Sequence, residues 1–399
     1  MQTVPTHVTR YGLSQIVNHL LQLDQAVPFE FLIGEDVLCT SLGSHISSRG
    51  ISAEKVLLIE YFPAMLPPTP DEDLPHDDWI SCIGVLKDSD GWTLASGCYD
   101  GVLKVWNDAG EHSQIPVHSS AVKSCAVIKN SQQLLTTGDD GSVHVWKYDE
   151  DMALVVSLCG HESSVESSSV RPDGERCATS GWDNDILVWK SGESLELEAS
   201  KGSKKPKRKK SRSLDDQIAA ATEVESLGSL QGHTQAVSDL KWVTAETMVS
   251  SSWDHSIKLW DVEMETVIET FSHNKVVTCI DTPSNGRIDI VAFGGAEKTV
   301  RVWDRREKQG TFLKSLQSLS SHTQWVSDIE WHPSSDHHML TASYDGSIKV
   351  WDIRAQIPLH TVTLPTEEKI FCCTWVNDTT IAHGGTNNKI SVMTMESLV

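Results

Sequence analysis

The sequence predicts a mainly β fold that is built from repeats, because three residue types recur in fixed register. A Trp returns at intervals of 40 to 48 residues, with one longer interval of 71. An acidic residue stands six positions before each such Trp, and a His stands 27 to 30 positions before it. The clearest copies are His161, Asp183 and Trp189; His233, Asp254 and Trp260; and His322, Asp345 and Trp351. Repeats of about 40 to 45 residues with short apolar runs between such markers are typical of a β-propeller.

The recurring polar residues are expected to be structural, as in WD40 repeats. A hydroxyl residue stands four positions before the acid in most copies: Ser96, Thr136, Thr179, Ser250 and Thr341. Buried polar side chains need partners, so His, Ser/Thr, Asp and Trp should form a hydrogen-bonded relay in each blade. Repeat five has Phe293 and Glu297 instead, and we expect its relay to be broken. A fainter seventh copy ends at Met393, so the sequence predicts seven blades over residues 76–399.

Residues 1–62 lack the repeat and indicate a small α+β domain. Apolar residues from Leu13 to Leu21 follow helical spacing, with Ser14 as a candidate cap. Strands are expected at 29–33, 37–39 and 56–61, and a short helix at 41–48. This order matches the later part of a ubiquitin-like β-grasp. The hairpin that normally precedes its main helix is missing, so we expect an N-terminally incomplete domain.

Residues 63–75 are rich in proline and acid, and the sequence predicts a semi-rigid, solvated linker there. Ring closure in propellers needs an outer strand for the last blade, which removes free sheet edges. Because proline removes backbone hydrogen-bond donors, the linker is a poor candidate, and we expect Glu396–Val399 to supply that strand.

The long Trp interval places an insertion at about residues 191–225, between the third and outermost strands of blade three. It has no apolar periodicity and is predicted to be a disordered loop. We expect it on the face of the propeller opposite the Asp turns, which are the turns that carry the recurring acidic residue. Six of its eight cations stand close together and are called the basic segment: Lys204, Lys205, Lys207, Arg208, Lys209 and Lys210. Such a cluster favours nuclear import, with RNA contact as an alternative.

Composition and motifs exclude several classes of function. The net charge is −22, and without the eight cations of residues 201–213 it would be about −30, which disfavours general nucleic-acid binding by the propeller. The nine cysteines show no CxxC pairing, and no apolar run is long enough for a membrane helix. Phosphate loops, zinc-protease motifs and nucleophile elbows are missing. We therefore expect no catalytic residues, no intrinsic metal site and no cofactor.

The N-terminal motifs RYGLSQIVNHLL and PFEFLI, followed by LPPTPDEDLPHDDWISC and the repeats, resemble the WD repeat-containing protein 12 family. The resemblance covers essentially the whole chain and implies an NLE-type ubiquitin-like domain before the propeller. It also implies a nucleolar and nucleoplasmic scaffold for large-subunit rRNA maturation and 60S pre-ribosome assembly. Its implied partners are the block-of-proliferation protein and pescadillo, with the propeller holding the former.

The same resemblance implies that the ubiquitin-like domain docks on midasin, an AAA ATPase with a metal-ion-dependent adhesion site. The family's metal-binding acid follows a Gly-Leu-Ser motif, and the matching run here is Gly50 to Glu54. Glu54 is thus the expected carboxylate ligand for midasin's divalent cation. A competing hypothesis is a propeller substrate receptor of a ubiquitin ligase, although no adaptor helix precedes the propeller.

Overall fold

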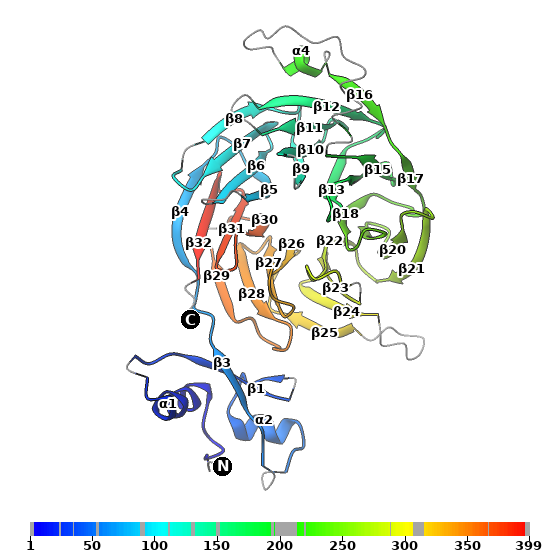
Figure 1. Ribbon diagram of the computed structural model, residues 1–399. Coiled ribbons are helices and arrows are strands. Elements are labelled where there is room, and N and C mark those ends of the chain that lie inside the picture. Colours follow the sequence, from blue (N-terminus) through cyan, green and yellow to red (C-terminus); the bar gives the residue numbers. More distant parts are fainter. Residues whose placement is uncertain are drawn as a thin grey trace.

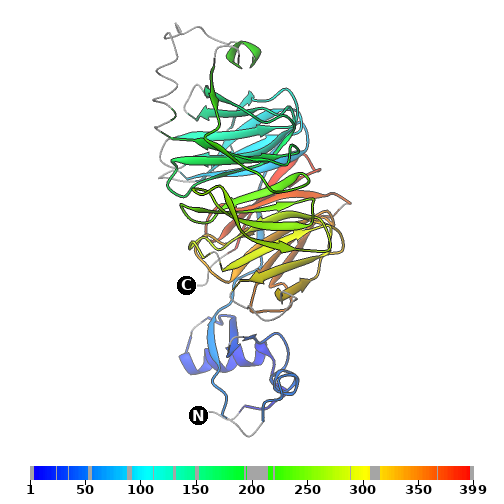
Figure 2. The same cartoon turned by 90° about the vertical axis from the view of Figure 1, so that its right-hand side faces the viewer.

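The computed structural model shows a ring of blades with a small N-terminal domain beside it (Figure 1). The structure describes residues 4–395 except 24, 35, 53–55, 88–91, 111, 129–131, 149–151, 193–194, 196–213, 219–220, 288, 306–314 and 366. Seen from its edge, the ring carries the N-terminal domain below its rim, with helix α4 (Leu214–Ile218) at the far side (Figure 2).

The ring has the seven blades that the sequence predicts, each built on a sheet of four antiparallel strands. In blades 1 to 3 these are β5 (Ile80–Lys87), β6 (Trp92–Cys98), β7 (Val102–Asn107) and β8 (His112–Pro116); β9 (Val122–Ile128), β10 (Gln133–Gly138), β11 (Val143–Lys147) and β12 (Ala153–Cys159); and β13 (Val165–Val170), β14 (Arg176–Gly181), β15 (Ile186–Lys190) and β17 (Gly228–Leu230). In blades 4 and 5 they are β18 (Val237–Trp242), β19 (Thr247–Ser252), β20 (Ser256–Asp261) and β21 (Thr266–Ser272); and β22 (Val277–Asp281), β23 (Ile290–Gly295), β24 (Thr299–Asp304) and β25 (Ser315–Ser320). In blades 6 and 7 they are β26 (Val326–Trp331), β27 (His338–Ser343), β28 (Ser347–Asp352) and β29 (His360–Thr363); and β30 (Ile370–Trp375), β31 (Thr380–Gly385), β32 (Lys389–Thr394) and β4 (Thr69–Pro75).

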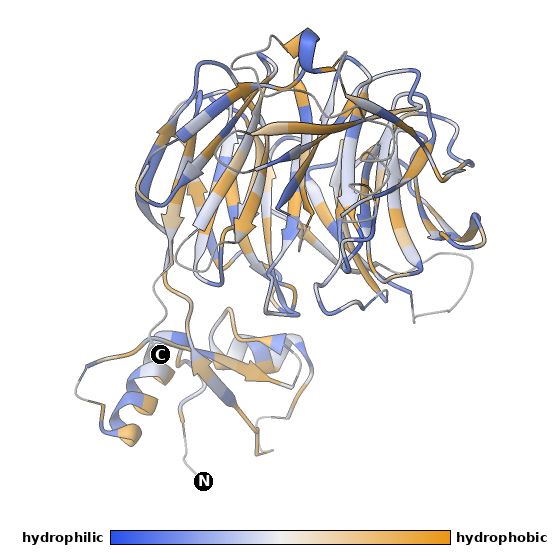
Figure 3. Ribbon diagram, turned by 45° about the horizontal axis from the view of Figure 1, so that its top comes forward, coloured by the Kyte–Doolittle hydropathy of each residue, from blue (hydrophilic) through white to orange (hydrophobic). Residues whose placement is uncertain are grey.

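The core lies between neighbouring blades. The middle strands of the blades are buried on both faces, as in β10 and β28, where all six residues are buried, and Figure 3 shows apolar residues in strands around the whole ring. One core cluster packs Ile186 and Val188 of blade 3 against Trp242, Met248 and Trp260 of blade 4. The repeat Trp residues are almost fully buried. At about 25 cal/mol per Å² and about 200 Å² each, every one contributes about 5 kcal/mol of hydrophobic stabilisation.

Ring closure differs from the prediction. The outer strand of blade 7 is β4, from the proline-rich segment, which pairs antiparallel with β32 from Thr69↔Thr394 to Pro75↔Lys389. The expectation that Glu396–Val399 supply this strand was wrong, and residues 69–75 form a strand rather than a linker, although six of the seven are exposed. Proline is tolerated because an outermost strand has only one hydrogen-bonded neighbour, and Leu74 adds an apolar side chain that is 2% exposed.

The insertion in blade 3 also differs from the prediction. It does leave between β15 and the outer strand β17, at the end of β15 opposite the Asp turn. However, it is not a featureless loop, because it contains α4 and β16 (Thr222–Glu225). Strand β16 pairs in parallel with β12 from Val156↔Thr222 to Cys159↔Glu225, so blade 2 has a fifth strand. Val224 and Leu214 pack against the adjoining apolar cores.

The N-terminal domain contains α1 (Arg10–Leu21), β1 (Phe29–Ile33), β2 (Asp36–Val37), α2 (Leu42–Ser48) and β3 (Glu60–Pro63), with sheet order β2-β1-β3. The predicted order of elements is confirmed, although the third strand starts later than expected. Ser14 does not cap α1, which starts four residues earlier. Its hydroxyl instead donates to the carbonyl oxygens of Arg10 and Phe29, tying the helix to the sheet.

The two domains touch through the loop that follows β28. The Arg354 guanidinium makes a bidentate ion pair with buried Asp352, with Nη2···Oδ2 at 2.7 Å, and lies 5.4 Å from the centre of the Phe62 ring. Its carbonyl oxygen accepts a hydrogen bond from the Val37 amide at 3.3 Å. Arg354 therefore contacts two strands of the N-terminal sheet, β2 through Val37 and β3 through Phe62.

Candidate partner-binding face

The predicted relay is present in four blades and is structural. In blade 4, the Trp260 indole N–H donates to Ser250 Oγ at 2.8 Å, and that hydroxyl lies 2.7 Å from His233 Nε2. His233 Nδ1 lies 2.8 Å from the Asp254 carboxylate. Blades 2, 3 and 6 repeat these contacts through His118, Thr136, Asp140 and Trp146; His161, Thr179, Asp183 and Trp189; and His322, Thr341, Asp345 and Trp351.

The relay fixes the charge of its carboxylates. Burial alone would raise the pKa of Asp254, but hydrogen bonds from His233, Ser256 and the Thr234 amide outweigh it and hold that pKa well below its usual range. Asp345 is held in the same way by His322 and Ser347. These carboxylates stay ionised and fully hydrogen-bonded, so they lock turns and have no free oxygen for catalysis.

Three blades depart from the relay. In blade 1, His76 binds Ser96 and the Leu74 carbonyl, and no described contact joins it to Asp100. In blade 5, as expected, Phe293 replaces the hydroxyl, and the buried Trp303 indole N–H has no hydrogen-bond partner among the described residues. In blade 7, His383 occupies the hydroxyl position and Met393 the Trp position. The apolar fifth blade is held by ring packing instead, with Phe271 5.0 Å from Trp303.

A second set of equivalent residues surrounds the mouth of the ring on the face of the Asp turns, and we call it the inner ring. Each blade contributes two residues. One lies directly before the innermost strand, and the other lies directly before the turn acid, which is the acidic residue six positions before the repeat Trp (Asn387 takes its place in blade 7). A backbone hydrogen bond of 2.9 to 3.1 Å joins each pair. The pairs are Trp79 and Tyr99, Ala121 and Asp139, Ser164 and Trp182, Ala236 and Trp253, Val276 and Ala296, Trp325 and Tyr344, and Lys369 and Thr386.

Aromatic side chains dominate much of the inner ring. From blade 6 to blade 1, ring centres follow one another at 6.5 Å (Trp325 to Tyr344), 5.7 Å (Tyr344 to Phe371) and 6.1 Å (Phe371 to Trp79). Across blades 3 and 4, Trp182 and Trp253 lie 5.6 Å apart. Trp79 is 44% exposed and Trp325 41%. Contiguous exposed aromatic rings of this kind are typical of protein-binding surfaces.

Charged side chains cross the inner ring between the aromatic groups. Lys123 lies 3.3 Å from the Glu166 carboxylate, which also accepts a hydrogen bond from the Trp182 indole N–H at 2.6 Å. Burial opposes the charge on Lys123, yet the Glu166 and Asp139 carboxylates and the Tyr99 phenol raise its pKa overall. Lys369 lies 5.4 Å from the centre of the Tyr344 ring. The face thus combines apolar area with fixed charges, which suits recognition of one protein partner.

The inner ring was missed from sequence because its positions differ from blade to blade and form no repeat. Aligning the seven copies on His and on the turn acid would have placed Trp79, Trp325, Tyr99, Trp182, Trp253 and Tyr344 at two shared positions. The residues expected to contact partners directly, Glu54 and the basic segment, lie outside the described residues, so their roles stay predictions.

No three His, Cys, Asp or Glu side chains come together as a metal site in the described part of the chain. Nor does any described helix have the length and apolarity needed to span a membrane.

Comparison with known proteins agrees with both parts of the molecule. A family model described as the NLE (NUC135) domain matches residues 2–46. The model of the WD domain, G-beta repeat, matches 72–107, 111–147, 152–190, 224–261, 265–304 and 313–352, so the matched spans end before blade 7. A protein of Chlamydomonas reinhardtii named "Ribosome biogenesis protein WDR12 homolog" is 36% identical over 95% of this chain and 89% of its own length.

The chain belongs to the WDR12 family of ribosome biogenesis proteins. Relatives with the same name occur in Oryza sativa subsp. japonica, at 34% identity over 98% of this chain and 91% of the relative, and in Nematostella vectensis, at 32% over 95% and 91%. The resemblance that the N-terminal motifs indicated is therefore confirmed, and the structure shows how a WDR12-family chain closes its propeller with the segment after the NLE domain.

Proposed function

We propose that this chain is a non-catalytic scaffold in ribosome biogenesis, needed for maturation of large-subunit rRNAs and assembly of 60S pre-ribosomes. Its membership of the WDR12 family supports the general role. The relay supports the non-catalytic part, because the acids and histidines that recur in the sequence hold the blades together.

The propeller binds the block-of-proliferation protein, within a complex that includes pescadillo, through the inner ring. The observation that carries this proposal is the exposed aromatic series from Trp325 to Tyr99, because such rings supply large, rigid apolar area for a partner. The described outer rim also exposes apolar side chains, Met264 and Ile268, but both are aliphatic and supply no aromatic ring.

The NLE domain docks on the midasin ATPase, with Glu54 as the carboxylate that completes the coordination of midasin's divalent cation. Traction by the ATPase then releases the scaffold from the pre-60S particle. The basic segment directs the chain to the nucleus, from where it reaches nucleolus and nucleoplasm. These parts of the proposal rest on the sequence motifs.

The test is a pull-down of the block-of-proliferation protein with a Trp79→Ala/Trp325→Ala double variant. Truncating a central aromatic anchor typically costs about 2 kcal/mol, so each substitution should weaken binding about 30-fold. The matched control is Met264→Ala/Ile268→Ala, which removes exposed apolar groups from blade 4 and should bind normally. Unchanged binding of the tryptophan variant, or recovery of cullin adaptors in place of ribosomal precursors, would overturn the proposal.

Midasin binding is tested separately with Glu54→Ala and Glu54→Asp. Both should lose midasin and keep the block-of-proliferation protein, because the two surfaces lie on different domains. Retention of midasin by both variants contradicts the assignment of Glu54.

A further inference from the structure

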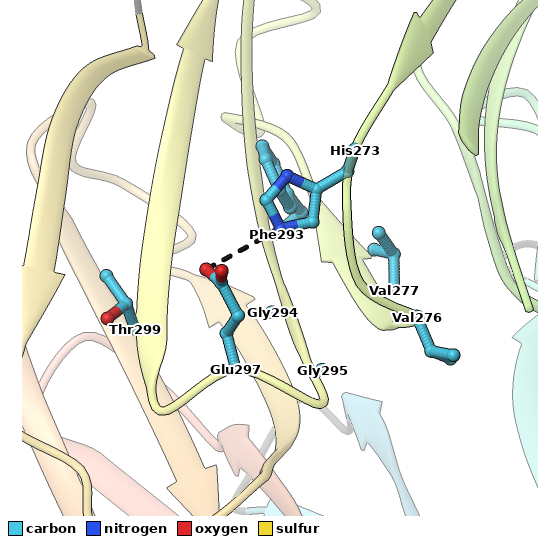
Figure 4. Close-up of a pocket in the computed structure, with 8 residues that line it drawn as sticks. All are labelled: His273, Val276, Val277, Phe293, Gly294, Gly295, Glu297 and Thr299. Carbon is cyan, nitrogen blue, oxygen red and sulfur yellow. Dashed lines mark ion pairs between the residues drawn. The ribbon is translucent and has the colours of Figure 1, made fainter. Parts of the chain in front are cut away.

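The inner ring has a gap at blade 5. Its pair there is Val276 and Ala296, two small residues between the neighbouring aromatic positions Trp253 and Trp325. A pocket opens beside this pair, lined by His273, Val276, Val277, Phe293, Gly294, Gly295, Glu297 and Thr299 (Figure 4). Only about one water molecule fits inside it, so a side chain of a partner can lie over this pocket but cannot enter it.

The turn that borders the pocket has a different backbone from its counterparts. The residue after the turn acid has a positive φ in the other six blades: 80° at Gly101, 76° at Gly141, 70° at Asn184, 67° at His255, 71° at Gly346 and 54° at Asn388. Lys298, at the equivalent position, is not among the residues with positive φ. A lysine side chain disfavours the left-handed conformation, so the substitution reshapes the turn.

The acid inside the pocket is already neutralised. Glu297 Oε2 lies 2.9 Å from Arg301 Nε and 3.5 Å from His273 Nε2, and Figure 4 shows the His273 and Glu297 side chains directed at each other. Burial lowers the pKa of His273, and its neighbour Glu297 only partly offsets this, so the imidazole is neutral at pH 7. Glu297 and Arg301 therefore cancel, and the pocket itself carries no net charge.

Two unpaired cations flank this neutral pocket. Lys275 and Lys298 are exposed, adjoin the pocket-lining residues in sequence, and make no ion pair or hydrogen bond with any described residue. The residues equivalent to Lys275 in the other blades are Asp78, Ser120, Ser163, Gln235, Gln324 and Glu368. Blade 5 is thus a positive site on the face of a protein with a net charge of −22.

We propose that Lys275 and Lys298, which flank the blade 5 pocket, contact an acidic side chain of the protein bound on the inner ring. This rests on the proposed function and adds the chemistry of one contact. The two cations are complementary to a carboxylate, and the pair between them, Val276 and Ala296, carries no aromatic ring. An RNA phosphate fits the face less well, because Asp78, Asp139, Glu166 and Glu368 stand along the same ring and would repel a polyanion.

The test is the double charge reversal Lys275→Glu/Lys298→Glu in the full chain. We expect binding of the recombinant block-of-proliferation protein to weaken about 10- to 100-fold, mainly through slower association that high salt masks. The matched control is Lys147→Glu/Lys190→Glu, which makes the same change of net charge at the ends of β11 and β15 opposite the Asp turns. It should bind like the unmodified chain. Lys275 and Lys298 are exposed, so their reversal should leave the melting temperature unchanged. Lys147 and Lys190 are half-buried, so the melting temperature of the control is measured beside its binding.

The outcomes separate this inference from the proposed function. If the tryptophan variant loses the partner and the Lys275/Lys298 reversal does not, the acidic contact is wrong and the inner ring still binds. If the reversal instead abolishes crosslinking of labelled rRNA and leaves partner binding intact, the ligand is a phosphate and the inference fails. Restoration of binding to the reversed variant by an acid-to-lysine change in the partner would support it directly.

Discussion

The relay makes a quantitative prediction, because the chain contains its own control. Trp260 and Trp303 occupy equivalent positions in blades 4 and 5, and both are fully buried. The Trp260 indole N–H donates to Ser250, whereas the Trp303 N–H has no partner among the described residues. Trp260→Phe and Trp303→Phe remove the same atoms, so the loss of packing nearly cancels when the two are compared.

The difference between the two variants can be estimated from the hydrogen bonds. Trp260→Phe loses one buried hydrogen bond, worth about 1 kcal/mol, while Trp303→Phe removes an unpaired N–H whose burial costs about 1 to 3 kcal/mol. Trp260→Phe should therefore be the less stable by about 2 to 4 kcal/mol. The entropy of unfolding is about 2.1 cal/mol/K per residue, so for the roughly 320 residues of the propeller the melting temperature shifts by about 1.5 °C per kcal/mol. The expected gap in melting temperature is about 3 to 6 °C.

Circular dichroism melting of the two purified variants measures this gap. Trp260→Phe combined with Ser250→Ala should cost little more than the worse single change, because both act on one hydrogen-bonded unit. Equal melting temperatures for Trp260→Phe and Trp303→Phe would refute the claim that the relay stabilises the blades beyond apolar packing.

Three further predictions follow from other contacts. A chain that starts at Ala64 should melt as a folded propeller, whereas one that starts at His76 lacks β4, leaves the β32 edge open and should aggregate; size-exclusion chromatography that finds both monomeric would contradict this. Arg354→Ala should release the N-terminal domain from the ring and raise its radius of gyration in small-angle scattering, with Lys349→Ala on the same blade as the unaffected control. Burial lowers the pKa of His383 from 6.5 to about 4, so this imidazole is neutral when folded but binds a proton when unfolded between those values. The contribution of the neutral His383 to the free energy of unfolding is complete above pH 6.5, and about 3 kcal/mol of it is lost as the pH falls to 4. His383→Leu should flatten that part of the pH–stability curve. An unchanged slope would exclude His383 as the source of the pH dependence.

Within the propeller, the sequence predicts those features that repeat and misses those that occur once. The blades and the broken fifth relay followed from the register of residues such as His233, Ser250 and Trp260, because buried polar groups must keep one geometry. Closure by β4 was missed because Pro70 and Pro75 argue against a strand, although an outermost strand leaves one edge unpaired and tolerates them. Strand β16 was missed because TEVE is too short and polar to show a pattern, and its pairing to blade 2 is decided by tertiary packing.

The candidate site shows the same division. The inner ring cannot be recognised from the sequence of one blade. Trp79 and Val276 occupy the same position in different blades, and the residues next to them in sequence do not show that this position lies on a shared surface. Only the ring geometry brings Trp325, Phe371 and Tyr99 together from blades that are far apart in the chain.

Strand β4 has two roles: its pairing with β32 closes the ring, and its first residue continues the segment that leads from the N-terminal domain. Thr69, where β4 begins, is opposite Thr394, close to the other end of the chain. Tension applied to the N-terminal domain therefore acts first on its contact with Arg354 of blade 6 and then on this ladder. The same six paired positions that shut the toroid also carry its mechanical load, so a force large enough to part them would open the ring at blade 7 and leave the other six blades intact.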